Sequence, residues 1–468
     1  MSLFNGNKLQ GREKRLSTLS AYVGTAHKLV KEEEDRQNIR TFSEATYDEV
    51  IYALKAILDI EDSVTVIHGP AGCSTSKIHY FAEGSKSSWY VTNLNERDTI
   101  LGGDEKLRET ITLAYKKHEP KIIFVLATAV VAINNDDISA VVLELEEELE
   151  TKIVPIFTDG FKSKTAINGY DVVLHAIGKY LVNGNKEDEK ENFLNLISVS
   201  ENNRNLIEIL LFLKELGINT NTIPKFSRYE DIKKASRAKV SIALNDDEGY
   251  FLGRGLEEHY NVPYISSVIP IGRKNTEKWL SLVSELFNVT DVARKIIDKE
   301  ALNKRKLIEE APLSKLKFYI DLPTSIGISL VSLIKELGGD VIGLTVDEVD
   351  EINKGKLEGL KYDLPIHVAS GQTFEVANIL YKLKPDIYIG SPYKTSWAAK
   401  LGVIPISIGK SALYGFNGDE NLVKLVKSAI RGKEATDNNA TLLYEEQLPY
   451  KEAWLKKSTN WYIKQEVK

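Results

Sequence analysis

The chain is poor in sulfur, because its 468 residues include one cysteine, Cys73, and one methionine. A single cysteine excludes an intramolecular disulfide, and it excludes a zinc or iron–sulfur site closed by thiolates of this chain alone. An all-cysteine cluster would need ligands from another polypeptide. The seven histidines are scattered and include no His-x₃-His pair. We therefore expect the histidines to be structural.

Long hydrophobic runs and an excess of positive charge are also missing. No stretch of about 18 apolar residues occurs, so no transmembrane helix is expected. Residues 1–6 lack the apolar core of a signal peptide. The net charge of −6 and the pI of about 5.8 disfavour nucleic acid and anionic membranes as partners. The sequence predicts a cytoplasmic protein without either partner.

Short β-branched runs alternate with longer helical patterns from about residue 60 onward. Such alternation is typical of parallel sheets crossed by helices, that is, of an α/β protein. The runs predict strands over residues 64–67, 122–126, 153–157, 196–199, 240–244, 262–265, 317–320, 341–344, 366–368, 387–389 and 403–406. The clearest helical patterns cover residues 141–149, 206–216, 291–306 and 330–337.

The alternation starts three times, which predicts three Rossmann-like, doubly wound domains and fits about 150 residues per domain. We expect a charged, partly helical arm that wraps a neighbour or packs on the surface, followed by the three domains: residues 1–40, 41–190, 191–310 and 311–468, the last with a C-terminal tail. Ligands of such folds bind beyond the carboxyl ends of strands. Candidate positions are therefore the loops after Ile67, Leu126, Phe157 and Ile389.

The loop after the first predicted strand, residues 68–77, reads HGPAGCSTSK. It lacks the Gly-Lys-Ser/Thr ending of a phosphate-binding loop, which disfavours a nucleotide site. Cys73 is a possible nucleophile if His68 or His79 acts as its base. A small buried thiol is the alternative, and the spacing alone favours it.

Residues 68–73 resemble the His-Gly-Pro-x-Gly-Cys signature of nitrogenase component 1 subunits and their relatives. These relatives include the catalytic subunits, the cofactor-scaffold proteins and the dark-operative protochlorophyllide reductases. Other segments resemble the family in the same order: residues 92–98, 101–107, 127–129 with 136–138, 159–161 with 169–171, and 414–418. The resemblance covers about residues 40–465. It implies three Rossmann-like domains and an iron–sulfur cluster buried at a subunit interface.

The chain departs from the catalytic subunits at the other metal ligands. In those subunits the loop cysteine is one of three, whereas this chain has Ser43 and Glu44 at the upstream position and Ala127–Ala129 at the downstream one. The resemblance therefore implies that no 8Fe-7S cluster forms. A molybdenum–iron cofactor would need a further cysteine and a histidine, and Tyr414 is the best match for that histidine. We expect no such cofactor to be held in the usual way.

One thiolate in this loop is the pattern of the β-like scaffold subunit. There a 4Fe-4S cluster takes three cysteines from the partner and one from this chain. The resemblance thus implies that Cys73 is a ligand of a shared 4Fe-4S cluster. It also implies two partners, a paralogous α-type subunit in a heterotetramer and an ATP-dependent iron–sulfur reductase. A carboxylate replaces one thiolate in the protochlorophyllide reductases, which makes Glu44 a second candidate ligand. A surface or helix-capping glutamate is the alternative.

Arg254, between Gly253 and Gly255, is assigned to a loop that could face a cofactor cavity, with a surface or structural arginine as the alternative. No catalytic residue is assigned. The sequence predicts an oxidoreductase subunit of nitrogenase component 1 type, of the β or scaffold kind, for ATP-driven reductive chemistry or cofactor assembly. One alternative is a metal-free structural or binding subunit that kept the fold. Another is a catalytic subunit that reduces a different small substrate.

Overall fold

The computed structural model describes residues 21–31, 38–40, 48–73, 88–158, 160, 168–309, 311–360, 363–391, 395–439 and 450–465. The chain forms two compact units. Unit 1 contains the described residues of 47–200 and 219–266, and unit 2 contains those of 16–46, 201–218 and 267–468. Unit 1 has two parallel sheets and unit 2 has one larger sheet. The division into three domains at residues 40, 190 and 310 stays a prediction.

The first sheet of unit 1 has the strand order β4–β3–β5–β6, and all its strands are parallel. The strands are β3 (Ser63–His68), β4 (Ser88–Val91), β5 (Ile122–Ala127) and β6 (Lys152–Phe157). Every residue of β3 and β5 is buried, as expected for parallel strands covered on both faces. The loops that follow β3, β4 and β5 therefore meet at one edge of the sheet.

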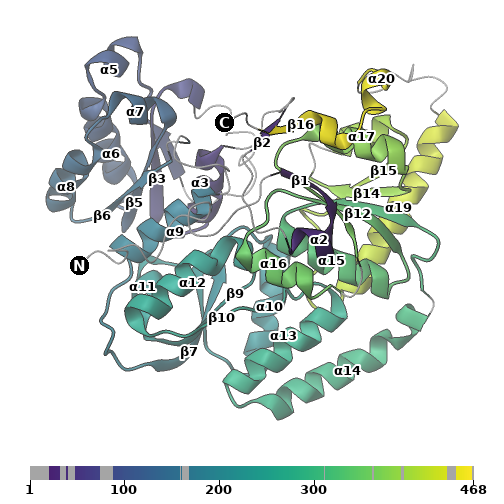
Figure 1. Ribbon diagram of the computed structural model, residues 1–468. Helices are drawn as coiled ribbons and strands as arrows, with labels where there is room; N and C mark the ends of the chain where they lie inside the picture. The colour runs from purple at the N-terminus through teal and green to yellow at the C-terminus, as the bar shows by residue number, and fades with distance from the viewer. Residues whose placement is uncertain are drawn as a thin grey trace. The chain divides into compact units, whose positions relative to one another are not determined.

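Helices cover both faces of this sheet (Figure 1). Alternate residues of β5, such as Ile122 and Phe124, share a core with α3 (Glu49–Ile57) and α9 (Asn168–Tyr180). The residues between them, such as Ile123, share a second core with α6 (Asp104–His118) and α8 (Ile138–Leu149). This two-residue period is the geometry of a strand. Two shorter helices, α5 (Glu96–Leu101) and α7 (Ala129–Asn134), follow β4 and β5.

The second sheet of unit 1 has the order β10–β9–β7–β8 and is also parallel. Its strands are β7 (Glu191–Ser198), β8 (Thr220–Pro224), β9 (Ala238–Ala243) and β10 (Tyr264–Ile265). The helical elements of this part are α11 (Tyr229–Lys233), η1 (Lys234–Arg237) and α12 (Asp246–Tyr260). Helix α12 packs against α9, so the two sheets of unit 1 share a core.

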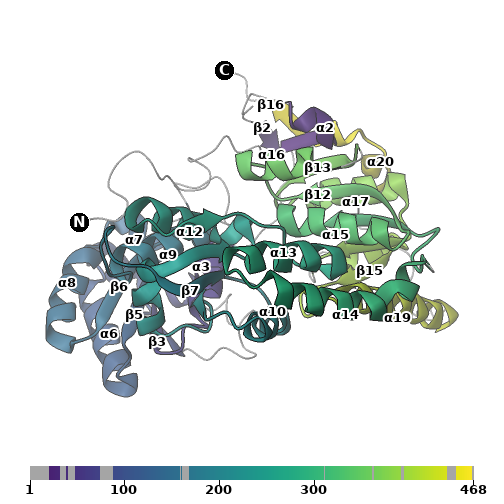
Figure 2. The ribbon, with the colours of Figure 1, turned by 90° about the horizontal axis from the view of Figure 1, so that it is seen from below.

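The sheet of unit 2 has the order β1–β13–β12–β11–β14–β15. Five strands are parallel: β11 (Lys317–Asp321), β12 (Asp340–Val346), β13 (Pro365–Ala369), β14 (Ile387–Gly390) and β15 (Ile404–Ser407). Strand β1 (Ala21–Thr25) is antiparallel to β13, and it pairs Val23 with His367. Figure 2 shows β12 and β13 side by side in this sheet.

The described helices of unit 2 comprise the helices that connect these strands and several others. They are α2 (Ala26–Leu29), α10 (Asn203–Glu215), α13 (Gly272–Leu286), α14 (Thr290–Glu309), α15 (Thr324–Glu336), α16 (Glu351–Glu358), α17 (Thr373–Leu383), α18 (Thr395–Lys400), α19 (Gly418–Asn439), α20 (Glu452–Leu455) and η3 (Thr459–Tyr462). Two short antiparallel strands, β2 (Asn38–Arg40) and β16 (Ile463–Gln465), pair with each other.

The α/β class and the parallel sheets predicted from the sequence are confirmed, and each predicted strand overlaps an observed one. In the described part of the predicted, partly helical arm, Ala21–Thr25 adds an edge strand to the sheet of unit 2 and Ala26–Leu29 is helical. Within the described residues, no helix is both long and apolar enough to span a bilayer.

Candidate functional site

Cys73 lies just beyond the carboxyl end of β3. Residues 71–73 are helical, and the Cys73 N–H donates to the Pro70 carbonyl oxygen at 3.1 Å. The thiol is half-buried and forms no disulfide. The turn therefore presents a single sulfur at the edge of the sheet where the loops after β3, β4 and β5 meet.

Residues from the neighbouring strands hold the backbone of this loop. The Gly69 N–H donates to Thr92 Oγ1 at 2.9 Å, and the Leu94 N–H donates to the Gly69 carbonyl oxygen at 3.1 Å. On the other side, Thr128 Oγ1 donates to the His68 carbonyl oxygen at 2.9 Å. A Cβ atom on Gly69 would overlap the Thr128 side chain, so this close approach requires glycine.

The His68 side chain is the centre of a buried hydrogen-bond network. Its Nδ1 lies 3.1 Å from Thr92 Oγ1, and its Nε2 lies 3.1 Å from Asp136 Oδ2. The same Asp136 oxygen accepts the Gly103 N–H at 3.2 Å. A Cβ atom on Gly103 would lie 2.8 Å from Asp136 Oδ2 and 2.9 Å from His68 Cε1, so glycine is required here too. Family-like segments that are distant in sequence thus meet behind the Cys73 loop.

Burial decides the charge of this network. It lowers the pKa of His68 to about 4, although the nearby carboxylate of Asp104 opposes the shift. Burial also raises the pKa of Asp136, and the Gly103 N–H opposes that shift. Near neutral pH we therefore describe a neutral imidazole that donates from Nε2 to the Asp136 carboxylate and accepts the Thr92 hydroxyl at Nδ1.

This arrangement argues against a cysteine nucleophile activated by His68. Both ring nitrogens of His68 are engaged by Thr92 and Asp136, so neither is placed to take a proton from the thiol. The other candidate base, His79, lies outside the described residues. Instead, His68 anchors the start of the Cys73 loop through these hydrogen bonds.

The half-buried His175 predicts an acid-sensitive contribution to stability, which the variant His175→Gln can isolate. Burial, with a smaller contribution from Lys179, lowers the pKa of His175 to about 4. The unfolded chain protonates this histidine near pH 6.5, so its contribution to stability is complete above that pH and is lost as the pH falls towards 4. Between about pH 7 and pH 5.5 the loss is about 1 kcal/mol.

Denaturant unfolding of both proteins at the two pH values measures this effect. The wild type should lose about 1 kcal/mol more than His175→Gln between them. Identical losses in the two proteins would show that the half-buried His175 ring does not titrate as described.

Two short helices next to the cysteine loop expose large apolar side chains. Ile100 and Leu101 of α5 are 81% and 71% exposed, and Ile133 of the adjacent α7 is 71% exposed. We call these three residues the α5–α7 patch. Both helices follow strands that flank β3, so the patch lies at the same sheet edge as the Cys73 loop. Grouped apolar side chains on a surface typically mark a contact with another protein.

The structure also locates the other residues that the sequence singled out. Ser43 and Glu44 lie outside the described residues, so the carboxylate candidate has no structural description. Ala127 ends β5, and Tyr414 is buried and bridges to Ile271 in unit 2. Among the described residues, no three His, Cys, Asp or Glu side chains are grouped to hold a metal.

The loop assignment for Arg254 is wrong. Arg254 lies in the middle of α12 and forms an ion pair with Glu257, one turn further along the helix. The flanking glycines suggested a loop, but Gly253 serves packing, because a Cβ atom there would overlap the ring of Tyr264. Sequence inspection also missed Thr92 and Asp136 as partners of His68. Their signal in the sequence was that each begins a family-like segment, residues 92–98 and 136–138.

Residues 50–430 match the family of nitrogenase component 1 type oxidoreductases, and the chain belongs to this family. Among its relatives is the nitrogenase iron-molybdenum cofactor biosynthesis protein NifE of Methanococcus maripaludis, with 27% identity over 399 residues, 80% of this chain and 81% of the relative.

The nitrogenase molybdenum-iron protein alpha chain of Methanothermobacter thermautotrophicus is 26% identical over 398 residues, 79% of this chain and 84% of the relative. The solved structure titled "Nitrogenase Cp1 at pH 6.5" has the same fold, with a TM-score of 0.74 and 18% identity over 90% of this chain and 98% of that one.

Proposed function

We propose that this protein is a β- or scaffold-type subunit of a cytoplasmic nitrogenase-like complex and that Cys73 is its one ligand to a shared 4Fe-4S cluster. The observation that carries the proposal is the single half-buried thiol on a loop fixed by the His68 network. Cluster iron is held by thiolate, and this sulfur is the one thiolate of the chain. The names of relatives such as NifE favour cofactor assembly over substrate reduction.

Ligand number supports a heteromeric complex. A cubane cluster takes about four protein ligands, and this chain supplies one thiolate. Two copies of the chain would supply two. A paralogous α-type subunit with three cysteines closes the site, and two-fold symmetry then favours an α₂β₂ heterotetramer. This chain therefore supplies one of the four ligands of a cluster site. When bound, the cluster would provide one-electron chemistry.

The α5–α7 patch supports a second partner, an ATP-dependent iron–sulfur reductase. Electrons must reach the cluster from outside, so the reductase has to dock close to Cys73. Ile100, Leu101 and Ile133 form an exposed apolar surface at that sheet edge. An exposed apolar surface of this kind typically marks a site where another protein binds.

Anaerobic purification of the chain, alone and with the co-expressed α-type paralogue, tests the proposal. We expect the chain alone to be soluble and poor in iron, and the co-purified complex to be brown. The complex should contain about four iron atoms per αβ unit. Its electron paramagnetic resonance signal should change when the reductase and ATP are added.

Other outcomes would redirect the proposal. An iron-free complex with the paralogue would identify a metal-free structural subunit. A full and stable cluster in a homo-oligomer of this chain would contradict the heteromeric arrangement and would favour Glu44 as a carboxylate ligand.

A further inference from the structure

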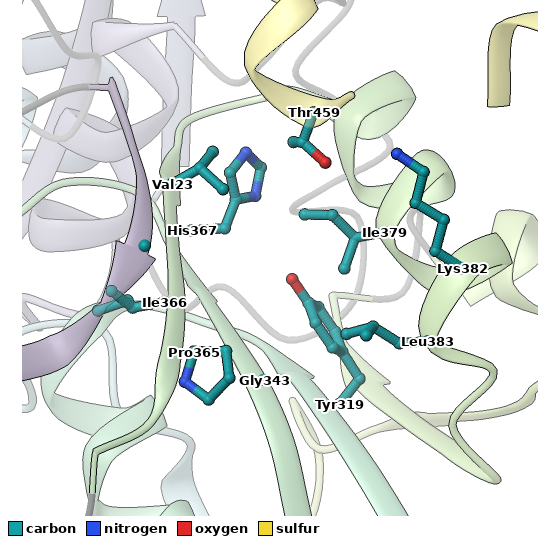
Figure 3. Close-up of a pocket in the computed structure, with 11 residues that line it drawn as sticks. Val23, Tyr319, Gly343, Pro365, Ile366, His367, Ile379, Lys382, Leu383 and Thr459 are labelled. Atoms are coloured by element: carbon teal, nitrogen blue, oxygen red, sulfur yellow. The ribbon is translucent and has the colours of Figure 1, made fainter. Parts of the chain in front are cut away.

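Unit 2 contains a cavity of about 190 Å³ between its six-stranded sheet and helix α17 (Figure 3). Residues from the sheet, from α17 and from η3 line it: Val23, Gly24, Tyr319, Gly343, Pro365, Ile366, His367, Ile379, Lys382, Leu383 and Thr459. None of these residues belongs to the family-like segments, and the cavity lies in a different unit from the Cys73 loop.

The cavity lies away from the carboxyl ends of the strands. Its strand residues include Pro365, the first residue of β13, and its α17 residues include Leu383, the last residue of that helix. Helix α17 returns from the carboxyl end of β13 to the start of β14, so its last turn lies near the amino ends of the strands. A ligand here would therefore be separate from one bound at the carboxyl edge of the sheet, where ligands of this fold class usually bind.

The inner wall is apolar, and a buried relay fixes its polar atoms. Tyr319 Oη lies 2.7 Å from Thr345 Oγ1, which lies 3.1 Å from His367 Nδ1. His367 Nε2 lies 2.7 Å from Glu375 Oε2, and the carboxylate is fully buried. Figure 3 shows the Tyr319 hydroxyl pointing towards the space between His367, Ile379 and Thr459. Because the relay already connects these polar groups to one another, what the cavity mainly offers a ligand is apolar contact.

The Lys382 side chain borders the cavity and extends towards Thr459 of η3 (Figure 3). Lys382 is exposed, and its Nζ donates to Asn378 Oδ1 at 3.1 Å and to the Lys457 carbonyl oxygen. Both acceptors are neutral, and Thr459 Oγ1 donates to the same Asn378 oxygen at 2.8 Å. No carboxylate within the described ranges lies at ion-pair distance from Lys382. Partial burial lowers the pKa of this lysine.

We propose that this cavity binds a small amphipathic carboxylate, with its apolar body inside and its carboxylate at Lys382. A dry apolar cavity of about 150 Å³ accepts benzene, so about 190 Å³ holds a ring of that size with a short substituent. An apolar interior with one charge at the rim is the usual design of a small-molecule site. Val23 and Ile379 would contact the ring, and the ammonium group would neutralise the acid.

Calorimetric titration of the full-length protein with benzoate and with benzyl alcohol tests this site. The two probes have a similar ring and differ in charge. We expect saturable binding of benzoate. Lys382→Met should weaken the binding of benzoate by about tenfold, which is the effect of losing one hydrogen bond to a charged group. The same variant should leave the affinity for benzyl alcohol unchanged. Lys427→Met, which removes an exposed lysine of α19 that does not line the cavity, is the matched control and should change neither.

Two filling variants test the location independently. Val23→Phe fills the cavity from β1, and Leu383→Trp fills it from α17. Each should abolish binding of both probes while circular dichroism confirms the fold. The proposal is overturned if the wild type shows no saturable binding, or if a folded filling variant binds as the wild type does. Equal affinity of the Lys382→Met variant and the wild type for benzoate would overturn the carboxylate assignment.

Discussion

Replacing Cys73 with alanine should remove the iron of the complex and its electron paramagnetic resonance signal, while the chain remains folded and paired with its partner. The sulfur is the only thiolate that this chain offers, and a cubane that loses one of about four ligands has an open, labile iron. The fold should persist because the turn is closed by a backbone hydrogen bond from Cys73 to Pro70, which alanine retains. We expect iron content to fall by about tenfold, since second-shell changes alone cost 10–100-fold in metal affinity.

The matched control is Ala71→Ser, two residues before the cysteine in the same helical turn. Ala71 is exposed, so the added hydroxyl faces solvent and should leave the iron content unchanged. Iron counting and paramagnetic resonance on anaerobically purified complexes compare the two variants. A Cys73→Ala complex with the iron and the spectrum of the wild type would exclude Cys73 as a ligand. Equal loss of iron in the control would show that the turn is merely sensitive to change.

Replacing Gly418 with alanine should destabilise unit 2 by at least about 3 kcal/mol. Gly418 begins α19, and a Cβ atom there would overlap the Leu413 carbonyl oxygen and lie 2.8 Å from the Gly272 nitrogen. Both neighbours are backbone atoms, so a change of rotamer cannot relieve the clash. The Gly272 N–H donates to that same Leu413 oxygen at 3.0 Å, and the Arg273 N–H donates to Asp419 Oδ1 at 2.8 Å. The substitution would therefore separate the starts of α13 and α19.

Gly432→Ala is the control, because it makes the same chemical change in the same helix. Nothing lies within 4 Å of a Cβ atom at Gly432, and the residue is exposed. Alanine there should stabilise the helix by about 0.5–1 kcal/mol. Denaturant unfolding followed by circular dichroism compares the two variants with the wild type. Similar stability of Gly418→Ala and Gly432→Ala would mean that the crossing near Gly272 is looser than described.

The sequence predicted the strands well where the sheets bury them on both faces. Residues 64–67 are all β-branched and residues 122–126 are a continuous apolar run, and they became the central strands β3 and β5. The edge strands β6, β10 and β15 were also predicted, whereas the edge strands β1, β4 and β8 were missed because partial exposure interrupts the apolar run. Strand β4 (Ser88–Val91) has no buried residue, and β1 shows no alternation of buried and exposed residues. Their position is decided by pairing with a central strand rather than by local preference.

The cysteine loop shows the same limit for the candidate site. The family-like segments were found in order along the chain, but their order does not say which of their atoms touch. The strand order β4–β3–β5 brings Thr92 and Asp136 to the two ring nitrogens of His68. The neutral state of that ring follows from burial, which cannot be calculated before the packing is known.

The sequence by itself determined the ligand number of this protein and its fold class. One cysteine can supply one thiolate in any conformation, and runs of β-branched residues between helical patterns can be buried only in parallel sheets covered by helices. The tertiary structure alone decided the His68 network, the helical position of Arg254 and the cavity beside Lys382. Each of these depends on contacts between residues far apart in the chain, and local sequence preferences carry no information about such contacts.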